Sequence, residues 1–104
     1  MDKAKQARLE AAGWKVGTPK EFLGLSEEDA EYVEIKVALA AFLKQRRTVL
    51  HISQNVAAKR LHSSQSRIAK MEGADKSVSL DLLLRSIFGL GGNRKMVADA
   101  ICPR

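Results

Sequence analysis

Two Ser-Gln pairs stand eleven residues apart, Ser53-Gln54 and Ser64-Gln65, and each opens a short segment of helical pattern. The second segment adds three more hydrogen-bonding or charged side chains: Ser66, Arg67 and Lys70. Amide groups both donate and accept hydrogen bonds, whereas guanidinium and ammonium groups bind anions. These residue types suit recognition of an anionic partner through hydrogen bonds and charge.

The two segments are predicted to be helices, over 54–60 and 65–72, because Ser53 and Ser64 are both suitable N-caps. In the first helix Ala57, Ala58 and Leu61 are expected to face inward, and in the second Ile68 and Met71. Only about four residues separate the helices. So short a turn forces a steep crossing angle, which is the helix-turn-helix geometry.

The remaining pattern is helical as well. A helix is expected over 29–48, one after Ser79 up to the break at LGGN (90–93), and one over about 93–101. The first has an apolar stripe at helical spacing: Val33, Ile35, Leu39, Phe42 and Leu43. Four basic residues are expected to fall outside it: Lys36, Lys44, Arg46 and Arg47. No stretch alternates convincingly with period two, so the body is predicted to be all-α.

Charge is spread unevenly along the 104 residues, which are enough for one domain. Residues 1–31 hold five Lys and Arg against seven Asp and Glu, a balance of −2. Residues 32–104 hold thirteen against five, a balance of +8. A basic body favours an anionic partner, most often nucleic acid, although a basic protein with a well-solvated surface has the same composition.

Several classes of function are disfavoured. The longest apolar run, VALAAFL at 37–43, is too short to span a membrane, and the charged N-terminus is unlike a signal peptide. Cys102 is the single cysteine, which favours a reducing cytoplasm, and it lies far from His51 and His62 in the sequence. No metal-ligand spacing, phosphate loop or acid-base pair appears. We therefore expect no catalytic residues, no metal and no cofactor.

The stretch ISQNVAAKRLHSSQSRIAKMEG, at 52–73, resembles the XRE family of lambda-repressor-like (Cro-repressor-type) helix-turn-helix domains. SLDLLLRSIFGLG, which follows it, resembles the next helix of that family, so the likeness covers about residues 38–92. The resemblance implies an all-α five-helix bundle that binds double-stranded DNA. We expect an N-terminal arm with a short helix over 1–28 and the DNA-binding domain over 29–104, with its helix-turn-helix at about 53–72.

The resemblance also implies roles for the polar residues of the two short helices. Gln54 would contact the DNA backbone, and Gln65 and Arg67 would lie nearest the bases. Ser66 would reach a base or a phosphate, Lys70 a phosphate, and the small Ser64 would let the helix end approach closely. The alternative is that these residues are simply a solvated helix face.

A buried ion pair is implied between Arg47 and Glu72, which would tie the first helix of the family to the third; the alternative is two unrelated surface charges. Some positions depart from the family pattern. His62 and His51 stand where glycine is usual, Val56 where a polar residue is usual, and Ala57 where leucine is usual. A left-handed backbone at His62 is uncommon but tolerable.

Two functions follow from the resemblance. The first is a sequence-specific repressor that binds a palindromic operator as a homodimer. The second comes from the leader RLEAAGWKV…EFLGLS, which resembles that of HigA-like antitoxins. As an antitoxin, the chain would bind a RelE/HigB-like toxin through the acidic stretch 26–31 or the apolar arm 14–25 and would regulate its own operon. A helix-turn-helix used for protein contacts alone is a third option.

Overall fold

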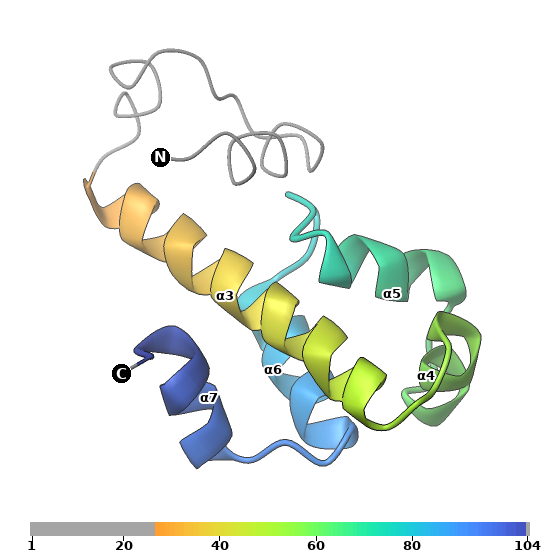
Figure 1. Cartoon of the computed structure of the whole chain (residues 1–104). Coiled ribbons are helices and arrows are strands. Elements are labelled where there is room, and N and C mark those ends of the chain that lie inside the picture. Colours follow the sequence, from red (N-terminus) through yellow and green to blue (C-terminus); the bar gives the residue numbers. More distant parts are fainter. Residues whose placement is uncertain (1–26, 104) are drawn as a thin grey trace.

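The computed structural model describes residues 27–103, and the helices in this range keep the labels of Figure 1. There are five of them: α3 (Glu27–Val49), α4 (Gln54–Arg60), α5 (Gln65–Glu72), α6 (Leu80–Gly89) and α7 (Arg94–Ile101). The described range contains no strand, so the predicted all-α fold is confirmed. The predicted arm over 1–28 lies outside the described residues, except for its last two residues, which begin α3.

The longest helix, α3, organises the fold. It runs diagonally in Figure 1 and packs against α5, α6 and α7, while α4 packs against α5. α5 and α7 lie on opposite sides of α3 in both views. The pair α4–α5 therefore lies at one side of the bundle, next to α3 and α6.

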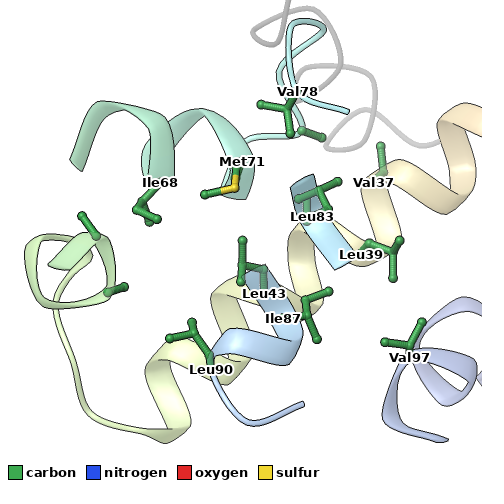
Figure 2. Close-up of a cluster of buried hydrophobic side chains, with 14 of the residues drawn as sticks. Val37, Leu39, Leu43, Ile68, Met71, Val78, Leu83, Ile87, Leu90 and Val97 are labelled. Carbon is green, nitrogen blue, oxygen red and sulfur yellow. The ribbon is translucent and has the colours of Figure 1, made fainter. Parts of the chain in front are cut away.

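A continuous apolar core joins the helices (Figure 2). Its largest fully buried apolar side chains come from three helices: Leu39, Leu43, Ile68, Met71, Leu83 and Ile87. Burial of one such side chain stabilises the fold by about 1.5–3 kcal/mol. Ile35 and Phe42, which were predicted on the same stripe, are only half-buried and pack against the edge of the core.

The prediction for Lys36 is wrong, because this side chain is buried, with 2% of its surface exposed. The buried face of α3 also includes Val33, Val37 and Ala40, so it is wider than the predicted stripe. The extra width arises because the loop between α5 and α6 covers this part of α3. The Lys36 ammonium donates to the carbonyl oxygen of Lys76 in that loop, with Nζ 3.3 Å from the oxygen.

Side-chain caps set where the short helices begin. The hydroxyls of Ser53, Ser64 and Ser79 accept hydrogen bonds from backbone N–H groups of α4, α5 and α6 at 3.1–3.2 Å. Each cap satisfies one of the backbone donors that a helix start leaves free. Asn93, expected as the first residue of the last helix, is instead its N-cap and accepts from Met96 N at 2.9 Å.

Four helices end in the same Schellman geometry, in which two backbone bonds close the last turn. At the end of α4, for example, Ser63 N donates to Ala58 O at 2.8 Å and His62 N to Lys59 O at 3.3 Å. This geometry requires one residue with a positive φ, which glycine adopts at the least cost. The residues in that position of α3 to α6 are His51 (φ 57°), His62 (φ 53°), Ala74 (φ 54°) and Gly91 (φ 88°). Both histidines thus adopt a left-handed backbone, as was considered for His62 from the sequence.

Candidate nucleic-acid interface

The short turn between α4 and α5 makes the two helices cross steeply, since Figure 1 shows α5 from the side and α4 nearly end-on. Ala57 and Ala58 on α4 and Ile68 on α5 are buried, so small side chains on one helix let the other approach closely. The turn is supported from below by α6, where Gly89 meets Leu61. A Cβ atom at Gly89 would lie 2.4 Å from Leu61 Cδ2, so a larger residue there would require the end of the Leu61 side chain to move.

Arg47 and Glu72 form an ion pair through two hydrogen bonds, which links α3 to α5. Arg47 Nε lies 2.6 Å from Glu72 Oε2, and Nη2 donates to Oε1 at 3.0 Å. The guanidinium also donates through Nη1 to the carbonyl oxygen of Ile52 at 3.0 Å. The hydrogen bond to Glu72 raises the pKa of Arg47, against the opposing effect of desolvation. The end of α3 is thereby joined to the end of α5 and to the chain that leads into α4.

The same carboxylate continues into a chain of amides. Gln54 Nε2 donates to Glu72 Oε1 at 3.2 Å, and Gln65 Nε2 donates to Gln54 Oε1 at 2.6 Å. The buried charge thus orients the Gln54 amide, which in turn orients the Gln65 amide. Gln65 keeps its Oε1 acceptor and one N–H donor for a ligand. The most exposed residue of this hydrogen-bonded series therefore offers a donor and an acceptor whose orientation is already fixed.

The outward side of α5 carries the polar residues singled out in the sequence. Ile68 and Met71 are buried, and the exposed residues are Gln65, Ser66, Arg67 and Lys70. Ser64, the cap, is also exposed, and its hydroxyl lies 3.3 Å from that of Ser66. Two cations and several hydrogen-bonding groups therefore share one face without a bulky apolar side chain among them.

A cleft of about 610 Å³ lies beside this face. On the α5 side it is lined by Ser64, Ser66, Arg67 and Lys70. On the other side lie residues that sequence analysis did not connect with the site, chiefly Ser77 and Ser79. No local pattern indicates them as site residues, because only the path of the α5–α6 loop brings them next to α5.

The α5–α6 loop is held by Asp75. Its Oδ1 accepts hydrogen bonds from Ser77 N at 2.9 Å and Ser77 Oγ at 2.7 Å. The backbone bond from Ser77 lowers the pKa of Asp75 most, followed by the hydroxyl bond and then by the charges of Lys70 and Lys36. The loop therefore has a fixed conformation where it lines the cleft. The charges of Lys70 and Lys36 partly compensate the negative charge of its Asp75 carboxylate.

No group of three or more His, Cys, Asp or Glu among residues 27–103 is placed to hold a metal ion. None of the helices described combines the length and the apolar character that a bilayer crossing requires. Cys102 is exposed beyond the end of α7.

Comparison with known proteins gives one family. A family model described as a helix-turn-helix domain matches residues 22–99, three quarters of the chain, and this span includes all of α3 to α6. Neither the curated proteins nor the solved structures give a match.

Proposed function

This chain belongs to the helix-turn-helix domain family, and on that premise we propose that it is a sequence-specific transcriptional regulator that inserts α5 into the major groove of double-stranded DNA. The observation that carries the proposal is the amide chain from Glu72 through Gln54 to Gln65. Such a chain gives an exposed side chain a fixed direction, which base recognition requires and a merely solvated surface does not.

The base contacts are assigned to the start of α5. Gln65, with one acceptor and one donor left, is complementary to the N6 and N7 edge of adenine. Arg67 offers the paired donors that guanine O6 and N7 accept, and Ser66 is short enough for a base or a phosphate. Gln54 supports Gln65, and its remaining N–H is assigned to a phosphate of the DNA backbone.

The DNA backbone is assigned to the cleft beside α5. Lys70 supplies charge to a phosphate there, and Ser77 and Ser79 line the opposite side. Backbone contacts fix the register of a protein on the duplex, whereas contacts to the base edges supply the specificity. The start of α5 is thus assigned to the bases, whereas Lys70 and the loop are assigned to the DNA backbone.

In biological terms we propose a repressor of the lambda-repressor-like, XRE kind. A single domain of this size makes few base contacts, and two copies on half-sites about 34 Å apart would raise both affinity and specificity. A homodimer on a palindromic operator in the cytoplasm, associated with the nucleoid, is the natural form. The proposal assigns no catalytic residue and no cofactor to the chain.

A second function, that of a HigA-like antitoxin, is favoured by the acidic first turn of α3. Glu27, Glu28 and Asp29 lie there, some twenty residues along α3 from Arg47 and the DNA-facing network. A basic RelE/HigB-like toxin could bind this end while α5 stays on DNA. Co-purification with such a toxin that is lost in Glu27→Lys/Glu28→Lys, but kept in the matched double variant Asp99→Lys/Asp81→Lys, would support it.

Selection of bound DNA from a random pool, repeated at two salt concentrations, tests the main proposal. A repressor enriches one palindromic sequence, and its affinity falls steeply as salt increases. Salt-sensitive binding with no enriched sequence would refute sequence specificity. A helix-turn-helix used for protein contacts alone would show no salt-sensitive affinity for DNA.

A further inference from the structure

Lys36 is a buried cation that takes no part in the hydrogen-bonded series Glu72–Gln54–Gln65. Its side chain is 2% exposed, and Nζ donates to the carbonyl oxygen of Lys76 at 3.3 Å. Burial lowers the pKa of Lys36, and the charge of Asp75 opposes this effect. Replacing a buried ionic group by an apolar one of similar volume is often neutral or stabilising. Stability alone is therefore a weak explanation for a lysine here.

The loop that Lys36 contacts behaves as one unit. At its start Asp75 N donates to Lys70 O at 3.0 Å, and further on Val78 N donates to Asp75 O at 3.0 Å. Ser77 is bonded to Asp75 through both its backbone and its hydroxyl. The hydrogen bond from Lys36 ends on Lys76, in the middle of this unit and next to Ser77 in the sequence.

Charge links Lys36 to the same cleft. Asp75 interacts electrostatically with Lys36 on the inner side and with Lys70 on the recognition helix. A carboxylate next to a phosphate-binding position repels DNA unless a nearby cation compensates its negative charge. Lys36 supplies this compensating positive charge from inside the protein. The Lys70 ammonium therefore stays available to bind a phosphate.

We propose that Lys36 is a positioning residue for DNA binding, and that its buried ammonium holds the α5–α6 loop, residues 73–79, at the spacing from α5 that admits a phosphodiester strand. The proposal rests on the proposed DNA-binding function. It assigns Lys36 no contact with DNA; it acts through Lys76 and Asp75.

The substitution Lys36→Met removes the ammonium and keeps most of the apolar stem. We expect its affinity to fall about tenfold on the selected operator and on a scrambled duplex alike, the size of one charge-assisted contact to a phosphate that the displaced loop no longer positions. Its free energy of unfolding in urea should be unchanged or higher. Lys44→Met is the matched control, since it removes the same charge from an exposed position of α3, and its loss should stay within about twofold.

Hydrogen exchange tests, in the absence of DNA, whether Lys36 holds the α5–α6 loop in place. In Lys36→Met the amides of Ser77 and Val78, which donate within the loop, should exchange faster than in the parent chain, while those of Ile68 and Met71 should not change. If the parent chain binds no DNA at all, the proposed function fails, while this comparison still decides whether Lys36 holds the loop.

Three outcomes would overturn the proposal: equal affinity losses in Lys36→Met and Lys44→Met, unchanged exchange at Ser77 and Val78, or faster exchange without a loss of affinity. Should Lys36→Met not fold, Lys36→Gln removes the charge and keeps a polar end. It should speed exchange at Val78 and weaken DNA binding, and an unchanged affinity would count against the proposal.

Discussion

Gln65 Nε2 donates to Gln54 Oε1 at 2.6 Å, so the first residue of α5 is joined to the first residue of α4. Gln54 is itself held by Glu72, whose side chain is 5% exposed. Two glutamines that could each adopt many rotamers are therefore ordered by one buried carboxylate. Order of this kind reduces the entropy lost when a side chain binds a base.

The bond between the glutamines predicts that they act as a pair in recognition. Gln65→Ala should lose about 1–3 kcal/mol of discrimination at one base pair. Gln54→Ala should lose part of the same discrimination, and the double variant should lose no more than Gln65→Ala alone. Fluorescence anisotropy on the operator and its single-base variants measures this. Additive losses would show that Gln54 contributes independently of Gln65.

Lys70 is predicted to contribute affinity without specificity. Lys70→Ala should weaken binding to every duplex by a similar factor and lower the slope of log K against log salt by about 0.9, as expected for one phosphate contact. Gln65→Ala should leave that slope as it is. A mobility-shift titration at four salt concentrations compares the two, and a base-selective loss in Lys70→Ala would reverse the assignment.

The ion pair between Arg47 and Glu72 is predicted to matter for stability. Arg47→Met leaves the Glu72 carboxylate buried without its main partner, which should lower the free energy of unfolding by about 3 kcal/mol. The matched control is Arg85→Met, whose pair with Asp81 is 78% and 74% exposed; its cost should stay below about 0.5 kcal/mol. Urea unfolding distinguishes them, and equal costs would mean that the Arg47 pair is as weak as a surface one.

The left-handed backbone at His62 predicts a stabilising substitution. The side chain is exposed and φ is 53°, so His62→Gly removes strain without losing packing. We expect it to raise the free energy of unfolding by about 0.5–1 kcal/mol after the extra entropy of an unfolded glycine is counted. His62→Val, a β-branched residue, should lower it instead. Thermal unfolding of both variants tests this, because the two midpoints should shift in opposite directions.

Asp75 predicts a specific loss of stability in acid. Its folded-state pKa lies below the ordinary value of 3.8, chiefly because of the backbone bond from Ser77. A carboxyl group of this kind stabilises the fold above that ordinary value, and its contribution is lost as the pH falls through its lowered folded-state pKa. Asp75→Asn should therefore show a shallower acid decline in unfolding free energy between pH 5 and pH 2, roughly the range over which carboxyl groups titrate. An identical decline in both proteins would assign the effect to other carboxyl groups.

The sequence by itself determined the local elements of the site. The spans 54–60 and 65–72 follow from a serine cap and an apolar period, and both match α4 and α5. Caps and periodicity act within one or two turns, so they can be recognised without knowing the rest of the fold. The left-handed positions at His51 and His62 are also local, since the backbone hydrogen bonds of a helix end involve only six neighbouring residues.

Only the tertiary structure decided which distant residues join these elements. The bond from Gln65 to Gln54 depends on the crossing angle of two helices, and the place of Ser77 beside α5 depends on where the loop lies on α3. Lys36 was predicted to fall outside the apolar stripe because its neighbours in the sequence do not reveal the loop that covers it. Contacts of this kind come from packing between segments some 10 to 40 residues apart, and the spacing of residues along one helix does not encode them.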